Sequence, residues 1–292
     1  MCYQALPTAY SKVATPFLKW AGGKTRLLPH LLPLIPDAKD FDSYYEPFLG
    51  GGALFFRLEA LGLLEGKRVV LGDFNPALMA TYQAVRDDVS SVIEKLHAHA
   101  RLHSAEYFST IRDAVNAPVD ESGTLGWTAD RLIYLNKTCF NGLMRYSKAG
   151  RFNSGWGKRA AFKVDVVGLE SASKALRGVT LVSGSYEGAL ALEGAAAGAR
   201  SLVYLDAPYV PLKANSFTRY TADGFGSEEQ VKLVKVARDL RDDGAHVILS
   251  NSDTPWTREL YHDFTLTRVL VGRPISQTPL GRARVGELVI ST

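Results

Sequence analysis

A short apolar run that ends in a rigid polar turn is the feature that most constrains the fold. Residues 201–205, Ser-Leu-Val-Tyr-Leu, have the pattern of a short buried strand, and Asp206-Ala207-Pro208-Tyr209 follows at once. Because proline cannot donate a ladder hydrogen bond, Pro208 ends the strand as a paired central element. A buried strand that ends in a carboxylate, backbone carbonyls and an aromatic ring is typical of open α/β sheets, which bind ligands at the carboxyl ends of their strands.

The order of strand and helix patterns predicts an α/β sheet interrupted by a helical insert. Strands are expected at residues 68–73, 180–182, 201–206, 246–250 and 266–271, and helices over 25–34 and from 76 onward. Residues 83–137 have a helical pattern, and 138–163 predict a glycine-rich hairpin or extended loop. We therefore expect a sheet domain formed by 1–82 and 164–292, with an inserted, mainly helical domain at 83–163.

Two helical regions carry more specific signals. Within the insert, six apolar residues are expected to face inward: Leu96, Phe108, Ile111, Val115, Leu132 and Leu135. Ser227-Glu-Glu-Gln230 has the spacing of a capping box and predicts the start of a helix, which Gly244 would end.

The composition is that of a cytoplasmic globular protein. The 292 residues suffice for one large α/β domain, or for one domain with an insert. No apolar run is long enough to span a membrane, and the first residues lack the pattern of a signal peptide. Cys2, Cys139 and the scattered histidines lack metal-ligand spacing, so we expect a reducing compartment and no metal site.

The positive charge is segregated, although the net charge is only +4. Residues 131–164 contain eight Lys or Arg and no Asp or Glu. A second acid-free run, 265–286, contains Arg268, Arg273, Arg282 and Arg284. Because aromatic residues such as Tyr134, Phe140, Tyr146, Phe152 and Trp156 are interleaved with the first run, this pattern favours a surface that binds a polyanion.

A glycine-rich segment near the N-terminus predicts a nucleotide-like site. Glu46-Pro-Phe-Leu-Gly-Gly-Gly52 lies between a strand and a helical pattern, where glycines let the backbone approach a ligand and expose amides. Asp73, 21 residues beyond Gly52, ends the next predicted strand, where an acid can accept the hydroxyl hydrogens of a ribose. The spacing is not that of a dinucleotide-binding fingerprint.

A second glycine segment, Ala21-Gly-Gly-Lys-Thr25, resembles part of a phosphate-binding P-loop. That motif requires a glycine at position 18, which is Leu here. The segment therefore does not indicate an NTPase.

Seven motifs in order give the chain a resemblance to the Dam family of DNA adenine-N6 methyltransferases, the D12 class. They are Phe17-Leu-Lys-Trp-Ala-Gly-Gly-Lys24, Glu46-Pro-Phe-Leu-Gly-Gly-Gly52, Asp73-Phe-Asn-Pro76, residues 135–146, Gly150-Arg-Phe-Asn153, Ser250-Asn-Ser-Asp-Thr254 and Val285-Gly-Glu-Leu288. They span nearly the whole chain. The resemblance implies a Rossmann-like methyltransferase sheet with a helical target-recognition insert, S-adenosylmethionine as cofactor and double-stranded DNA as substrate.

The resemblance also implies a set of cofactor-binding residues. Asp73 would bind the ribose, while Trp20, Phe48 and Tyr186 would face the adenosyl or sulfonium group, which gains cation–π energy over an aromatic ring. Lys24 and the amides of Gly50 and Gly52 would meet the methionine carboxylate or nearby polar groups. Glu46, Pro47 and Asp206 complete the set.

The catalytic turn implied by the resemblance is Asp206 to Tyr209. Tyr209 would stack on an adenine flipped out of the duplex, while Asp206 and the carbonyl of residue 207 would accept its two N6 hydrogens. The family pattern is Asp-Pro-Pro-Tyr, and this chain has Ala207 at the first proline. Alanine supplies the same carbonyl but lacks the fixed φ of proline, so we expect an active enzyme that is slower.

The resemblance assigns DNA recognition to the basic insert. Asn141, Leu143 and Arg145 would enter the major groove with Lys19, and Lys148, Lys158 and Arg159 would contact phosphates. A short site of the GATC type is expected. Arg151, Gly155 and Trp156 depart from the residues commonest in the family, so a related site is an alternative.

Two other functions stay open at this point. One is methylation of RNA or of a protein amide. The other is a DNA-binding homologue that has lost catalytic activity because of Ala207. We expect a monomer, with a cognate restriction endonuclease as one conceivable partner.

Overall fold

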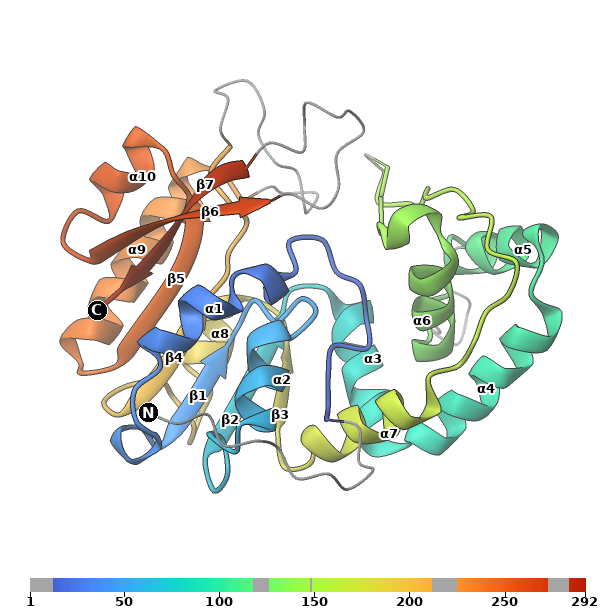
Figure 1. Ribbon diagram of the computed structural model, residues 1–292, viewed down its shortest axis with the longest axis horizontal. Helices are drawn as coiled ribbons and strands as arrows, with labels where there is room; N and C mark the ends of the chain where they lie inside the picture. Colours follow the sequence, from blue (N-terminus) through green and yellow to red (C-terminus); the bar gives the residue numbers. More distant parts are fainter. Residues whose placement is uncertain (1–12, 118–125, 148, 212–224, 273–283) are drawn as a thin grey trace.

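The computed structural model describes residues 13–117, 126–147, 149–211, 225–272 and 284–292, and its centre is a seven-stranded sheet (Figure 1). The strands are β1 (Ser43–Glu46), β2 (Arg68–Asp73), β3 (Thr180–Ser183), β4 (Ser201–Leu205), β5 (His246–Ser252), β6 (Thr265–Gly272) and β7 (Arg284–Ser291). Their order is β3-β2-β1-β4-β5-β7-β6. Strands β1 to β5 pair in parallel, and β7 runs antiparallel between β5 and β6. The Rossmann-like α/β sheet is thus confirmed.

Strand side chains alternate between two buried clusters, one on each face of the sheet. On β4, Leu202 and Tyr204 join the cluster that also contains residues of α2 (Ala53–Ala60), while Val203 and Leu205 join the other. This period of two follows from the pleat of a strand, and both faces are apolar because helices cover both.

The strand order changes direction between β1 and β4. Strands β2 and β3 lie on one side of β1, whereas β4 and β5 lie on its other side. Strand β1 pairs with β2 on one side and with β4 on the other, so the connections leaving these strands diverge. Such a switch point leaves a crevice at the carboxyl ends of the two strands. Residues 46–52 after β1 and 206–209 after β4 lie at this edge.

Helices cover the sheet and extend beyond one side of it. Their bounds are α1 (Leu28–Leu31), α3 (Pro76–Asp87), α4 (Val89–Leu102), α5 (Ala105–Val115), α6 (Ala129–Thr138), α7 (Val166–Ala175), α8 (Tyr186–Leu190), α9 (Ser227–Asp242) and α10 (Pro255–Leu260). Figure 1 shows α4 to α6 on the right, and α9 and α10 at the opposite end of the molecule. All six residues predicted to face inward in the helical region are buried. The division at residues 83 and 163 stays a prediction.

Three local expectations need correction. Residues 25–34 form α1 between two 3₁₀ turns, because Pro29 and Pro33 interrupt a continuous helix. The sequence does not predict strand β7, because its first residues stand out only as part of a basic run and of the motif Val285-Gly-Glu-Leu288. The cap of α9 is Gly226, whose amide donates to Glu229 Oε2 at 3.0 Å, rather than Ser227.

The glycine-rich segment after α6 is an irregular hairpin. A 3₁₀ turn at Phe140–Gly142 begins it, and two isolated bridges join its two sides, Cys139 with Trp156 and Tyr146 with Phe152. In the part of the chain that the structure describes, no helix combines the length and apolar character needed to cross a membrane.

Candidate active site

The carboxylate of Asp206 lies directly after β4 and is held from two sides. Lys24 Nζ lies 2.8 Å from its Oδ2, and Ser250 Oγ donates to its Oδ1 at 2.7 Å. Because the only hydroxyl hydrogen of Ser250 goes to Asp206, the Tyr204 hydroxyl, 3.1 Å away, donates to Ser250 Oγ. The position of this carboxylate is therefore fixed by side chains of two other segments, Lys24 and Ser250, and Tyr204 in turn holds Ser250.

Tyr209 is the aromatic member of the turn. Its hydroxyl donates to Glu287 Oε2 at 3.1 Å, and Lys24 Nζ lies 4.7 Å from the centre of its ring. Burial and the nearby charges of Asp206 and Glu287 raise the pKa of Tyr209 well above its ordinary value, so the hydroxyl stays protonated and donates. Ala207 is buried within the apolar cluster formed with α9.

Two carboxamides hold the backbone on either side of Tyr209. Gln230 Nε2 donates to the Pro208 carbonyl at 2.7 Å, and the Val210 amide donates to Asn251 Oδ1 at 2.9 Å. The two side chains are joined, since Asn251 Nδ2 donates to Gln230 Oε1 at 3.0 Å.

The glycine segment after β1 is a tight loop stabilised by Asp73. Gly50 and Gly52 have φ values of +50° and +67°, which glycine adopts without strain. The Gly50 amide donates to Asp73 Oδ2 at 2.9 Å, and the Gly52 amide donates to the Leu49 carbonyl at 2.7 Å. In this structure both amides are thus hydrogen-bonded to protein oxygens, and their role toward a cofactor carboxylate stays a prediction.

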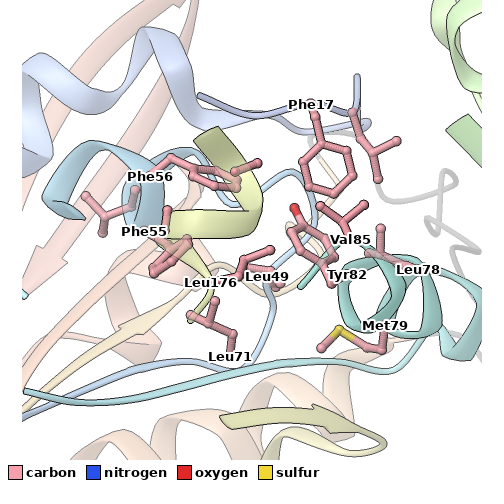
Figure 2. Packing of buried hydrophobic residues seen from close by; sticks show 14 of the residues in the cluster. Phe17, Leu49, Phe55, Phe56, Leu71, Leu78, Met79, Tyr82, Val85 and Leu176 are labelled. Carbon is pink, nitrogen blue, oxygen red and sulfur yellow. The ribbon is translucent and has the colours of Figure 1, made fainter. Parts of the chain in front are cut away.

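Helix α3 packs against the same loop. Figure 2 shows Tyr82 of α3 beside Leu49 and close to Phe17, whose ring centre is 5.0 Å from that of Tyr82. The Tyr82 hydroxyl donates to the Gly50 carbonyl at 3.1 Å. The loop therefore lies on a packed apolar base and has little freedom to collapse.

Glu46 is a buried acid at the end of β1, with only 3% of its surface exposed. Its Oε2 accepts hydrogen bonds from the Tyr44 hydroxyl at 2.8 Å and from the Phe55 amide at 3.1 Å. Burial, reinforced by the charge of Asp206, raises the pKa of Glu46 to about 8.

The predicted aromatic residues separate into two groups. Trp20 lies against the glycine loop, because a side-chain carbon placed on Gly50 would be 3.1 Å from its indole ring. Phe48 and Tyr186 stack with ring centres 5.2 Å apart, and Phe225 packs edge-on against Phe48 at 6.0 Å. The structure therefore does not bring Trp20 together with the other two in one ring cluster.

A pocket lies between the two glycine segments and the catalytic turn. It is lined by Ala21, Gly22, Gly23, Lys24, Glu46, Leu49, Gly50, Gly51, Gly52, Ala53 and Asp206. Five predicted residues thus meet in one cavity wall: Lys24, Glu46, Gly50, Gly52 and Asp206. Trp20, Pro47, Phe48, Asp73 and Tyr186 lie outside this lining, and Asp73 acts on it through the Gly50 amide.

Most residues predicted to bind DNA are on the surface of the hairpin. Lys19, Asn141, Arg145, Lys158 and Arg159 are exposed, Leu143 is half-buried, and Lys148 lies outside the described residues. Asn141 and Lys158 have φ values of +57° and +53°. His103 Nε2 donates to the Arg159 carbonyl at 3.1 Å, which ties this part of the hairpin to the end of α4.

The buried Asn136 of α6 connects the hairpin region to the first motif. Its Nδ2 donates to the Lys19 carbonyl at 2.6 Å, and its Oδ1 accepts from the Lys19 amide at 2.9 Å. Gly142 lies close to the Lys19 side chain, since a side-chain carbon added there would be 2.8 Å from Lys19 Cδ.

Neither metal nor thiol chemistry is suggested by the described residues. Among them, no three His, Cys, Asp or Glu side chains are grouped as metal ligands. Cys139 is buried, and burial raises the pKa of its thiol to about 11, so it is a poor nucleophile.

Several residues that build the site had no role predicted from the sequence. Ser250, Asn251 and Glu287 lie within quoted motifs, so position in those motifs was the available signal. Gln230 was interpreted only as part of a capping box. Phe74, a large ring that is 60% exposed directly after Asp73, lies within the motif Asp73-Phe-Asn-Pro76 but had no predicted role of its own.

Comparisons with known proteins identify the family of the chain. The model of the D12 class N6 adenine-specific DNA methyltransferases matches residues 20–273. The Type II methyltransferase M1.LlaDCHI of Lactococcus lactis subsp. cremoris is 35% identical over 283 residues, covering 94% of each chain. The Type II methyltransferase M.MjaIII of Methanocaldococcus jannaschii is 36% identical, with 89% of this chain and 92% of the relative covered. A DNA adenine methylase of Vibrio cholerae is 31% identical over 94% of each chain. The chain belongs to the D12 class N6 adenine-specific DNA methyltransferase family.

Proposed function

We propose that this chain transfers the methyl group of S-adenosylmethionine to N6 of an adenine that has been flipped out of double-stranded DNA. The observation that carries the proposal is the position of Asp206 and Tyr209, at the carboxyl end of β4 and beside the pocket formed by the glycine loop. A hydrogen-bond acceptor and an aromatic ring at that edge suit a planar base that presents an amino group.

The residues of the pocket fit S-adenosylmethionine chemically. The carboxylate of Asp206 suits its ammonium or sulfonium cation, and the ammonium of Lys24 suits its carboxylate. Glu46, which is largely protonated near neutral pH, offers hydrogen-bonding oxygens rather than a charge. Asp73, at the end of β2, lies where an acid binds a ribose in related sheets. The exposed ring of Phe74 beside it offers a face for an adenine ring. When bound, the cofactor supplies an electrophilic methyl group.

The residues of the turn orient the acceptor nitrogen. Asp206 and the carbonyl of Ala207 accept hydrogen bonds from the two N6 hydrogens, and these bonds direct the nitrogen lone pair toward the pocket. Tyr209 stacks on the base and replaces part of the stacking energy lost on flipping. Positioning and electrostatics then account for most of the rate, and the chain needs no covalent intermediate.

The hairpin and Lys19 form the DNA-recognising surface in this proposal. Arg145 and Asn141 are exposed and able to reach base edges, while Lys158 and Arg159 contact phosphates. GATC or a related short sequence is the proposed site.

A silent DNA-binding homologue is the less favoured function. Ala207 keeps its backbone carbonyl, and the turn around it is held by Gln230 and Asn251. A decayed site would not be expected to retain these buried partners together with Asp206.

The decisive experiment is transfer of a tritiated methyl group to unmethylated duplex DNA, with duplex RNA and protein as parallel acceptors. Mapping of modified adenines at single-base resolution then gives the recognition sequence. Modification confined to one short DNA motif supports the proposal, whereas preferential labelling of RNA or protein contradicts it. The variant Asp206→Asn should abolish transfer and weaken S-adenosylmethionine binding much less, since the other residues of the pocket remain.

A further inference from the structure

A buried glutamine on α9 faces the catalytic turn. Only 2% of the Gln230 surface is exposed, and its neighbours on the helix, Leu233 and Val234, belong to the apolar cluster. An amide in such surroundings is costly unless both of its ends are hydrogen-bonded. Here both are: the nitrogen donates to the Pro208 carbonyl and the oxygen accepts from Asn251.

Asn251, on β5, completes the contact with the turn. It is also 2% exposed, and its Oδ1 accepts from the Val210 amide at 2.9 Å and from the Ser252 amide at 2.8 Å. The Pro208 carbonyl and the Val210 amide are the backbone groups on either side of Tyr209. A helix and a strand therefore fix both peptide groups that set the orientation of the Tyr209 ring.

The chain has a specific need for such a support. Proline at position 207 would fix φ there and restrict Asp206, and Ala207 does neither. We propose that Gln230 and Asn251 are positioning residues that hold the catalytic turn in place of this missing constraint. The inference rests on the proposed function, because the turn matters for rate only if Asp206, the Ala207 carbonyl and Tyr209 hold the adenine.

The first test separates positioning from stability. Gln230→Met fills the same volume but removes both hydrogen bonds, and we expect kcat to fall by about 10- to 100-fold, as for a displacement near 1 Å. Binding of S-adenosylmethionine should change less than about twofold, since the pocket does not include Gln230. Leu233→Ala is the matched control: it removes a side chain of the same helix that is 1% exposed and belongs to the apolar cluster. It should lower the melting temperature and leave kcat, measured well below that temperature, nearly unchanged.

The second test asks whether proline replaces the glutamine. In the Gln230→Met background, Ala207→Pro should restore kcat by about fivefold or more, a larger ratio than the same change produces in the native chain. Equal effects of Ala207→Pro in both backgrounds would contradict the inference. So would equal losses of kcat in Gln230→Met and Leu233→Ala.

A third readout does not depend on activity. Hydrogen–deuterium exchange of the segment 203–211 should be faster in Gln230→Met than in the native chain, and Ala207→Pro should slow it again. If the native chain transfers no methyl group to DNA, the proposed function fails, yet exchange still decides whether the two carboxamides hold the turn. Unchanged exchange in Gln230→Met would overturn the inference even in an active enzyme.

Discussion

The ammonium of Lys24 and the carboxylate of Asp206 form an ion pair 2.8 Å long, with only 11% and 15% of the two side chains exposed. The two residues are 182 positions apart, and the pair joins the first glycine segment to the turn after β4. Lys24 also lies over the Tyr209 ring, so one cation contacts both predicted catalytic side chains. An adenine amino group that approaches Asp206 must share the carboxylate with Lys24 or displace it.

Removal of Lys24 alone should destabilise the protein. Lys24→Met leaves a largely buried carboxylate without its cation, and loss of one partner of a buried pair costs on the order of 3 kcal/mol. The double variant Lys24→Met/Asp206→Leu should recover most of that stability, because a buried pair replaced by apolar residues is often neutral. Denaturant unfolding measures both changes.

An exposed ion pair provides the control. Arg200 and Asp42 are 2.6 Å apart but 53% and 66% exposed, so Arg200→Met should leave the unfolding free energy nearly unchanged. A loss from Arg200→Met as large as that from Lys24→Met would show that burial does not distinguish the two pairs.

Glu46 should make stability fall as the pH rises. Its pKa is about 8 in the folded state, against 4.5 for the ordinary side chain, so the folded protein binds the extra proton between these values. The unfolded chain ionises first; the loss of folding free energy therefore begins above pH 4.5 and is complete above about pH 8. Glu46→Gln should flatten this dependence, as measured by denaturant unfolding at a series of pH values. An unaltered slope in that variant would assign the dependence to other groups.

Asn136 should couple the DNA-recognising surface to the cofactor loop. It clamps the Lys19 backbone, and Trp20, the next residue, lies against Gly50. Asn136→Ala should raise the dissociation constants for both S-adenosylmethionine and DNA by about tenfold, the equivalent of one lost hydrogen bond. Isothermal titration with each ligand measures the two effects separately.

The structure contains a matched clamp for comparison. Asn116 makes the same pair of bonds to the Phe152 backbone, each 2.8 Å long. Asn116→Ala should weaken DNA binding through the hairpin and leave affinity for S-adenosylmethionine unchanged. If both variants lower cofactor affinity equally, the clamp on Lys19 has no special link to the loop.

The parts of the site that follow parallel strands could be predicted from sequence. Glu46 ends β1, Asp73 ends β2 and Asp206 follows β4, and the carboxyl ends of parallel strands share one edge. Motif order then indicated that the glycine loop and the turn after β4 lie together. Five strands of the sheet followed from apolar runs. Strand β1 was implied only as the strand before the glycine segment, and β7 was not predicted because its first residues have the composition of a basic loop.

Contacts between side chains of distant elements could not be predicted in the same way. Gln230 fits a capping-box pattern, and only the packing of α9 against β5 shows that its amide reaches Pro208 and Asn251. The use of the Gly50 and Gly52 amides likewise depends on the path of the loop, which brings Asp73 within 2.9 Å of Gly50. Local patterns carry no information on such pairings.

The basic hairpin should make DNA binding steeply salt-dependent. Lys158 is exposed and lies in the segment 131–164, which contains no Asp or Glu, so its charge is available to neutralise a phosphate. Lys158→Ala should reduce the slope of log K against log salt concentration by about 0.9, because one counterion fewer is released.

Lys235→Ala is the control. It removes an equal charge from α9, which lies at the opposite end of the molecule from α4 to α6 (Figure 1), and it should leave the slope unchanged. Titrations at several salt concentrations, with fluorescent duplex DNA, measure the slopes. Equal slopes for the native chain and Lys158→Ala would remove Lys158 from the DNA contact surface, and an affinity that does not depend on salt would argue against the whole basic surface.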